Sequence, residues 1–481
     1  MPDAPEKLPE KLPVPFQGKK VVIVGAGFAG LNAAKRLGHK TDRRGELEIT
    51  VLDRHNYHLF QPLLYQVAMA GLSPGDISTP IRTVLAGYKN TRVLMAEAQG
   101  VDLKNRKVIT DGGAIDYDYL VLGLGSQQSY FGHEEWEPNA PGLKSLEQAT
   151  EVRRRVLTAF ELAERESNPD RIRQLLTFVV VGGGPTGVEL AGSLGEITRY
   201  TLSKDFRHID PRSTRIILIE AGPRILPSFD PKLSQRATRD LENLGVTIWT
   251  GVRVTNISKE GVTLGDEMVR SETILWAAGV KPASLNAKLG VPLDRAGRVI
   301  VGEDLSIPGF PEVFVMGDQA CCIDKETGKP LPGLAPVAMQ QGRAVAESIL
   351  NDLDGKTRKP FQYFDKGQMA TIGRRKAVAE AGKMKLTGVL AWYAWLLVHV
   401  YYLVGFKNRV SVMFQWFWSY VTFKRGAQII TNREWQSFAK SEVVQASEGT
   451  GGQIINSPPS GMPSVRGPEV TRTTAQPAHV H

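Results

Sequence analysis

The chain has 481 residues, a formal net charge of +9 and a hydrophobic content of 42%. This length exceeds one ordinary domain and predicts two or three domains, each able to bury a core. The basic balance is compatible with nucleic acid, an anionic membrane surface or an anionic substrate. The sequence shows no zinc-finger spacing, no RNP-like aromatic motif and no long Lys/Arg block, which argues against nucleic acid.

The two cysteines, Cys321 and Cys322, are adjacent in the sequence. This placement excludes a disulfide framework and indicates a reducing compartment, and we interpret both as small buried residues. The first residues are rich in proline and lack an apolar core of the kind that secretory signals carry. We therefore expect a flexible N-terminal arm over residues 1–17 and a catalytic body on the cytoplasmic side.

The first element pattern is a buried strand, a glycine turn and a helix over residues 19–37. The turn contains Gly25, Gly27 and Gly30 in the spacing GxGxxG, and Asp53 ends the next strand. In such a unit the first glycine allows a tight turn, the second admits a pyrophosphate, and the third permits close helix–strand packing. The helix N-terminus favours the phosphates and the acid accepts from a ribose hydroxyl, so residues 19–53 predict dinucleotide binding.

The same plan repeats further along the chain. A charged helix is expected over about 145–170, and then Gly182, Gly184 and Gly187 follow a second apolar strand, with Glu220 ending the next one. An acid at this position accepts from a 2′-hydroxyl and repels a 2′-phosphate, which favours NADH over NADPH. Arg224 leaves the phosphate alternative open. Two fingerprints in one chain predict two bound dinucleotides.

A third strand end carries Gly317 and Asp318 in the motif VMGD, and residues 334–350 read as a helix. A carboxylate at this position commonly meets the ribityl chain of a flavin. The pattern resembles the two-dinucleotide-binding-domain flavoproteins, in which the first unit holds FAD and an inserted unit holds NAD(P)H. The resemblance implies that non-covalently bound FAD contacts Gly25, Gly27, Gly30, Asp53 and Asp318. It implies that NADH contacts Gly182, Gly184, Gly187, Glu220, Ala278 and Gly279.

Disulfide reductases of that group carry a redox CxxxxC pair, which residues 31–70 lack, and sulfide oxidation needs separated cysteines. Electrons must therefore leave the flavin directly for an outside acceptor. The segments RHNYHLFQPLLYQVA (54–68), GGGPTGVELAG (182–192), VMGDQA (315–320) and LAPVAMQQG (334–342) are similar to the type II NADH:quinone oxidoreductases. The resemblance implies transfer of two electrons from NADH through FAD to a membrane quinone, menaquinone or ubiquinone, without proton pumping.

The resemblance also implies functional residues. The quinone motif of the family, AQxAxQ, corresponds to Ala335–Gln340, where Pro336 replaces the first glutamine and Gln340 matches the second. Glu189 is expected near the nicotinamide and the flavin, where it influences protonation. The expected sets are, for catalysis, Glu189 and Gln340; for the quinone, Ala335, Pro336, Met339 and Gln340; and as further FAD contacts, Arg54, Gly125, Ala335 and Val337. His55 and His58 lack partners at ligand spacing, so no metal is expected.

Residues 386–406 form an uncharged run that, at about 1.5 Å per residue, could cross a hydrocarbon core of roughly 30 Å. Its Trp and Tyr side chains prefer the interface. A second aromatic run follows at 410–423, and cationic residues bracket it: Lys407, Arg409, Lys424 and Arg425. We expect a monotopic anchor on the inner leaflet of the cell membrane; a spanning or re-entrant segment and a buried oligomer interface are the alternatives.

The expected fold is α/β, with two Rossmann-like domains for FAD and NADH and a C-terminal membrane-anchoring helical segment. The expected ranges are an arm (1–17), FAD-binding parts (18–145 and 298–360), an NADH-binding domain (146–297), an anchoring domain (361–438) and a disordered tail (439–481). A homodimer through C-terminal apolar surface is plausible. Two other functions remain open: a soluble NAD(P)H-dependent reductase of a ferredoxin-type protein, and an NADH-sensing flavoprotein scaffold of the apoptosis-inducing-factor type.

Overall fold

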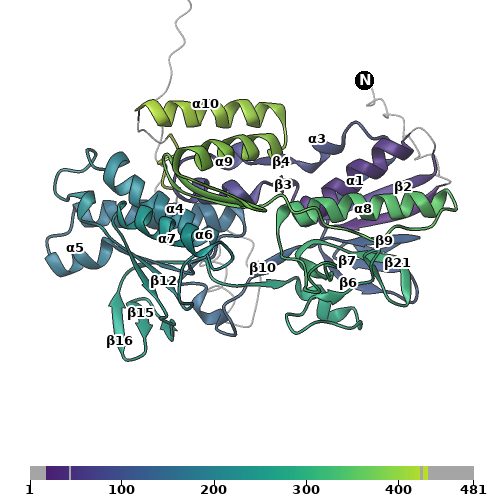
Figure 1. Ribbon diagram of the computed structural model, residues 1–481, viewed down its shortest axis with the longest axis horizontal. Helices are drawn as coiled ribbons and strands as arrows, with labels where there is room; N and C mark the ends of the chain where they lie inside the picture. Colours follow the sequence, from purple (N-terminus) through teal and green to yellow (C-terminus); the bar gives the residue numbers. More distant parts are fainter. Residues whose placement is uncertain (1–17, 43–44, 423–425, 432–481) are drawn as a thin grey trace, which may run out of the picture. The chain divides into compact units, whose positions relative to one another are not determined.

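A computed structural model of the chain describes residues 18–42, 45–422 and 426–431 (Figure 1). The predicted arm (1–17) and tail (439–481) lie outside the described residues. The α/β fold with two Rossmann-like units is confirmed.

The first unit is built on a six-stranded sheet in the order β20-β21-β9-β1-β2-β5. All neighbouring strands in it are parallel except β20 and β21. Helices α1 (Phe28–Thr41) and α8 (Ala335–Leu353) lie side by side against it (Figure 1). The strands are β1 (Lys19–Val24), β2 (Leu47–Asp53), β5 (Thr91–Met95), β9 (Tyr119–Leu122), β20 (Ser306–Ile307) and β21 (Phe310–Val315).

The second unit has a parallel four-stranded sheet in the order β13-β12-β11-β17. The predicted charged helix forms as α4, but it is amphipathic and buries one face, including Val152 and Phe160, against this unit. The strands are β11 (Thr177–Val181), β12 (Arg215–Glu220), β13 (Val246–Thr250) and β17 (Thr273–Trp276). The helices are α4 (Leu146–Glu164), α5 (Pro169–Leu175), α6 (Pro185–Glu196) and α7 (Pro231–Glu242).

Small sheets and short helices accompany these two units. The strands β10 (Ser126–Gln128) and β18 (Val280–Pro282) form an antiparallel pair. In the sequence, β10 precedes the strands of the second sheet and β18 follows them. The others are β3 (Tyr57–Leu59) with β4 (Ser78–Pro80); β6 (Ala98–Asp102), β7 (Lys107–Thr110) and β8 (Gly113–Asp116); β14 (Asn256–Ile257), β15 (Gly261–Leu264) and β16 (Glu267–Arg270); β19 (Val299–Ile300) with β22 (Ala320–Cys321); and helices α2 (Leu64–Ala68) and α3 (Ile81–Leu85).

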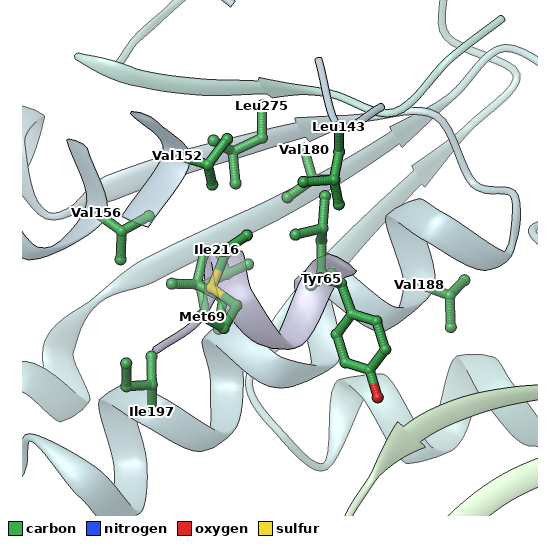
Figure 2. Packing of buried hydrophobic residues seen from close by; sticks show 14 of the residues in the cluster. Tyr65, Met69, Leu143, Val152, Val156, Val180, Val188, Ile197, Ile216 and Leu275 are labelled. Atoms are coloured by element: carbon green, nitrogen blue, oxygen red, sulfur yellow. The ribbon is translucent and has the colours of Figure 1, made fainter. Parts of the chain in front are cut away.

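The short helix α2 belongs to the first unit in sequence but is buried in the core of the second. Figure 2 shows Tyr65 and Met69 among side chains of α4, α6 and the second sheet, such as Val156 and Val188. Tyr65 and Met69 are almost inaccessible to solvent. The segment FQPLLYQVA (60–68), which is part of the run that carried the family resemblance, therefore packs in the core of the second unit and fixes the two dinucleotide-binding units to each other. We call residues 60–69 the α2 segment.

The C-terminal region contains a small sheet, which the sequence did not predict, before the two helices. It opens with an antiparallel sheet of β23 (Gln368–Gly373), β24 (Lys376–Ala381) and β25 (Met384–Thr387), followed by α9 (Gly388–Tyr402) and α10 (Phe406–Thr422). The sheet was missed because contacts with distant segments hold it in place: a Cβ on Gly192 of α6 would lie 1.8 Å from the Ile372 carbonyl oxygen. Among the described residues, no helix combines the length and apolarity needed to cross a membrane.

Met69→Ala removes a fully buried side chain from the α2 segment. We expect it to lower the free energy of unfolding by about 2–5 kcal/mol, because the lost contacts and the residual cavity both count. Urea unfolding of the FAD-loaded protein measures the change. The matched control is Met95→Ala, since Met95 is 66% exposed and its loss should change stability by less than about 0.5 kcal/mol. Equal effects of the two substitutions would contradict the structural role of α2.

Candidate functional site

The first glycine turn has the backbone shape that the fingerprint predicts. Gly25 has a φ of +95°, and a Cβ there would lie 2.5 Å from the Gly123 carbonyl oxygen. A Cβ on Gly30 would lie 1.8 Å from the Gly25 carbonyl oxygen, whereas no atom lies within 4 Å of the Cβ position of Gly27. Gly25 and Gly30 thus close the turn tightly, while Gly27 borders open space at the N-terminus of α1.

Asp53 binds the backbone of this turn, a contact that the sequence did not reveal. Its Oδ2 accepts from the Ala26 N–H at 2.7 Å and its Oδ1 accepts from the His55 N–H at 2.8 Å. A carboxylate oxygen has more than one acceptor site, so these bonds leave capacity for a ribose hydroxyl. The acid therefore joins the end of β2 to the glycine turn and orients itself in doing so.

The second turn reproduces the first. Gly182 has a φ of +110°, a Cβ on Gly187 would lie 1.8 Å from the Gly182 carbonyl oxygen, and the Cβ position of Gly184 is open. Glu220 accepts from the Gly183 and Gly222 N–H groups, each at 2.6 Å. Both turns therefore offer open space over the second glycine, a helix N-terminus and an oriented acid, which fits two dinucleotides.

Arg224 is the residue because of which NADPH remained an alternative to NADH. Its side chain is hydrogen-bonded to backbone carbonyl oxygens. Its guanidinium donates to the carbonyl oxygens of Leu226, Pro227 and Phe229 at 2.7–3.3 Å. These bonds hold the loop after β12 and point the arginine away from a phosphate-binding role.

Ala278 and Gly279 follow β17, and their carbonyl oxygens accept from Nε2 of Gln128 at 3.0 and 2.8 Å. Gly279 has a φ of +72° and lies against the Phe131 ring. Gln128, which the sequence analysis missed, thus links β10 to the strand end expected to meet NADH.

Asp318 lies in a partly buried chain of polar groups. Ser126 Oγ donates to Asp318 Oδ2 at 2.6 Å, and Lys144 Nζ donates to Ser126 Oγ at 3.2 Å. Burial lowers the pKa of Lys144, and the nearby Asp318 charge opposes that effect. Gly125, with a φ of +68°, turns the chain just before Ser126. Ser126 and Lys144 were missed because they meet Asp318 only through folding.

The predicted quinone segment forms the first turns of α8. Pro336 stands in the first turn, where its missing N–H costs no hydrogen bond, so the departure from AQxAxQ leaves the helix intact. The Gln340 amide exchanges two hydrogen bonds with the Phe364 backbone, each at 3.0 Å. Its neighbour Gln341, which was not predicted, is buried and accepts from the Gly317 N–H at 2.7 Å.

The remaining side chains of this segment lie at different depths. Val337 and Met339 are buried, Ala335 is half-buried, and the Cβ of Ala338 lies 3.5 Å from the Cβ position of Gly317. The start of α8 therefore packs against the Asp318 turn. Arg54, by contrast, is exposed.

Glu189 lies in the second turn of α6 and faces the C-terminal region. Its Oε1 accepts a long bond, 3.5 Å, from the Thr371 N–H of β23. Burial raises its pKa from 4.5 to about 8, against smaller opposite effects of the Thr371 N–H and the Trp395 indole. The Trp395 ring, buried in α9, stacks on His399 at 4.1 Å. The helix that begins at the second glycine turn is thus connected to the aromatic helix α9.

The two cysteines are buried, as the sequence indicated, and His58 is buried as well. His58 is buried with its Nδ1 2.9 Å from the Ala26 carbonyl oxygen, and burial lowers its pKa. Cys321 and Cys322 are buried free thiols, and burial raises the pKa of Cys322 to about 11. No group of three or more His, Cys, Asp or Glu suited to a metal ion occurs in the described part of the chain.

Two sheets of this topology with twin glycine turns define a pyridine nucleotide-dependent flavoprotein. Residues 19–342 match the family model described as pyridine nucleotide-disulphide oxidoreductase, and residues 366–425 match the NDH2 C-terminal domain. A solved structure, NDH2 from Plasmodium falciparum in complex with NADH, superposes with a TM-score of 0.78 at 19% identity, covering 86% of this chain and 100% of that one. The sulfide:quinone oxidoreductase of Aquifex aeolicus shares the fold with a TM-score of 0.65.

Relatives define the family more narrowly. The chain is 43% identical over 450 residues to the type II NADH:quinone oxidoreductase Ndh of Mycobacterium tuberculosis, covering 90% of this chain and 94% of the relative. It is 31% identical to the corresponding enzyme of Staphylococcus haemolyticus, covering 77% and 91%. The chain therefore belongs to the type II NADH:quinone oxidoreductases, FAD-dependent NADH dehydrogenases, as its sequence motifs predicted.

The raised pKa of Glu189 predicts how the stability of the folded protein depends on pH. Between pH 4.5 and about 8 the unfolded carboxyl is ionised while the folded one keeps its proton, so the wild type loses stability as pH rises through this window and no further above it. Glu189→Gln should abolish this component. Its thermal midpoint should therefore rise relative to wild type between pH 5 and 8, measured by fluorescence. The exposed Glu242→Gln is the control, and a difference for Glu189→Gln that does not vary with pH would contradict the assignment.

Proposed function

We propose that the residues inferred from the sequence perform the family's reaction, transfer of two electrons from NADH through FAD to a quinone without proton pumping. FAD is held by Gly25, Gly27, Gly30, Asp53, Arg54, Gly125, Asp318, Ala335 and Val337; NADH is held by Gly182, Gly184, Gly187, Glu189, Glu220, Ala278 and Gly279. The domain ranges are 18–145 with 298–360 for FAD, 146–297 for NADH and 361–438 for membrane attachment. FAD supplies the hydride-accepting ring and the protein supplies its binding and orientation.

The observation that carries this proposal is the position of Glu189. Its carboxyl is on the helix that starts at the NADH turn, and it is bounded by Thr371 of β23 and Trp395 of α9. With a pKa near 8, it holds a proton at neutral pH. Reduction of a quinone to a quinol consumes two protons, and a general acid works best with a pKa near the working pH. Glu189 is therefore proposed to hold a proton for this reaction.

The quinone is proposed to approach the start of α8, at Ala335, Pro336, Met339 and Gln340. Two contacts support this position: α8 packs against the Asp318 turn, and Gln340 binds the Phe364 backbone that leads into β23. Because the Gln340 amide is engaged on both sides, its proposed role is to shape this wall of the site. Ala335 and Pro336, which are half-buried, are proposed to line the entrance of this site.

Attachment to the membrane is proposed through α9 and α10. Large apolar side chains recur at helical spacing on their outer faces: Leu390, Tyr393, Leu397 and Tyr401; and Phe406, Val410, Met413, Phe414, Phe417 and Val421. All are more than half exposed, whereas Trp395 and Val412 on the inner faces are buried. Two helices with such outer faces and nearby cations suit monotopic binding to an anionic leaflet.

The cytoplasmic face of the cell membrane is the proposed location, because Lys407 and Arg409, in the first turn of α10, suit the anionic inner leaflet. Lys424 and Arg425 lie outside the described residues. The proposed partners are menaquinone or ubiquinone, this leaflet and a second copy of the chain. A homodimer would cover part of the apolar outer faces, and light scattering of the detergent-solubilised protein measures its mass.

The test of the reaction mixes the purified protein with NADH and a short-chain quinone and follows NADH absorbance. Reoxidation by the quinone is expected at a rate that supports turnover. Rapid reduction by NADH followed by very slow reoxidation would support the scaffold alternative. Turnover only with a ferredoxin-type protein would support the soluble reductase.

Glu220→Gln tests the NADH site. An amide accepts through one oxygen only, so either Gly183 or Gly222 loses its acceptor, and the charge that repels a 2′-phosphate disappears. Loss of a charged hydrogen bond predicts a rise of about tenfold to a hundredfold in KM for NADH and a shift of preference toward NADPH. Initial rates with both nucleotides measure it. The exposed Asp266→Asn, in the same domain, should change neither; unchanged kinetics in Glu220→Gln would refute the assignment.

Leu397→Glu/Phe414→Glu tests the anchor. Two carboxylates on the outer faces should release the protein from membrane vesicles, because burying each charge in the apolar layer costs several kcal/mol. Activity with a water-soluble quinone should persist. Met95→Glu/Met268→Glu places the same charges on exposed side chains elsewhere and should leave binding intact. Membrane retention of the first double variant would disprove the anchor.

A further inference from the structure

A cavity of about 460 Å³ opens between the second unit and the C-terminal end of α10. Its lining includes Glu196, the cations Arg374, Arg375 and Lys376, and Ser419 and Tyr420 of α10. Among the lining residues that the structure describes, three cations and one carboxylate carry a net charge of +2. None of these residues belongs to the two glycine turns or the quinone segment, so neither dinucleotide nor quinone accounts for the cavity.

The cations are held in place by the fold. The Arg374 guanidinium donates to the carbonyl oxygens of Ser419 and Tyr420 at 2.8 and 2.9 Å, and its N–H donates to Glu196. Arg374 and Arg375 each lie 5.2 Å from the centre of the Tyr420 ring. These bonds fasten the turn between β23 and β24 to the end of α10 and set the charges in one place.

Arg375 occupies a conformation that an arginine seldom adopts. It is the second residue of the two-residue turn between Gly373 and Lys376, and its φ is +60°. Asn or Gly is preferred at such a position, since a side chain in the left-handed region costs about 1–2 kcal/mol. Neither Arg375 nor Lys376 forms an ion pair with any residue that the structure describes. Arg375 is also exposed at the cavity, so its strained side chain is accessible to a ligand of opposite charge.

The cavity borders the apolar outer faces of α9 and α10. Trp418 and Val421, which flank Ser419 and Tyr420, are 53% and 60% exposed. The Trp392 ring of α9 lies 5.8 Å from Tyr420. A ligand here would meet cations at one end and an apolar surface at the other, which is the chemistry of a phospholipid with an anionic headgroup.

We propose that this cavity binds the phosphate headgroup of an anionic phospholipid, while the acyl chains lie along the outer faces of α9 and α10. The inference rests on the proposed membrane attachment and adds to it a specific lipid site. Arg375 and Lys376 bind the phosphate, and Arg374 positions the turn. A free inorganic phosphate shares the headgroup chemistry, but the adjoining apolar surface favours the lipid.

The test is co-sedimentation of the FAD-loaded protein with vesicles of phosphatidylcholine alone or mixed with phosphatidylglycerol. The variant is Arg375→Asn/Lys376→Gln, which removes two charges and relieves the turn. Each cation near an anionic surface contributes about 1 kcal/mol, so binding to the mixed vesicles should weaken roughly thirtyfold. Binding to phosphatidylcholine alone and turnover of a water-soluble quinone should not change.

Lys259→Gln/Lys383→Gln is the matched control, because both lysines are exposed and Lys383 lies beyond the opposite end of β24. It should retain the preference for phosphatidylglycerol. An equal loss in both double variants would assign the preference to overall charge and overturn the site. A preference left intact in Arg375→Asn/Lys376→Gln would overturn it too.

Two further outcomes separate this site from the anchor. If wild type binds neither kind of vesicle, the proposed attachment fails and the lipid site with it; if it binds both equally, the attachment stands and the lipid site is refuted. A thermal shift with inorganic phosphate that the variant abolishes, without any vesicle preference, would assign the cavity to a soluble phosphate instead.

Discussion

The structure depends on the burial of α2 in a core that is not its own. The chain leaves β2 of the first unit, and then Leu63, Tyr65 and Met69 enter the cluster formed by α4, α6 and the second sheet. Removing these side chains from water favours the contact by roughly 1.5–3 kcal/mol for each large residue. Together with the β10–β18 pair, this contact holds the two dinucleotide-binding units to each other, and the proposed hydride transfer depends on their relative position.

The α2 segment and the residues after it also contact the C-terminal helices α9 and α10. Gln66, next to Tyr65, accepts from the Trp416 indole at 2.7 Å, and the Tyr65 and Trp395 ring centres are 6.4 Å apart. Asp76, a few residues further along, accepts from Ser411 and Gln415 of α10. One segment therefore contacts both units and the apolar helix pair, so that Glu189, the Asp318 turn and the outer faces of α9 and α10 are held in a fixed arrangement.

The two carboxylates at the ends of β2 and β12, Asp53 and Glu220, are both oriented by hydrogen bonds from the backbone. Each acid binds the backbone of its own glycine turn, so the protein itself sets the orientation of the carboxylate. Preorganisation of this kind reduces the ordering cost of ligand binding. Lys144 and Ser126 do the same for Asp318, although they come from a different part of the chain.

The sequence by itself determined the two βαβ units, their glycine turns and terminal acids, the buried cysteines and the family, because each is encoded in short-range spacing of residue types. Tertiary structure alone decided the burial of α2, the β23–β25 sheet, the partners of Gln340 and Asp318, the raised pKa of Glu189 and the basic cavity beside Tyr420. These features arise between segments tens to hundreds of residues apart, and the energy of burial and charge pairing depends on contacts that no local pattern records.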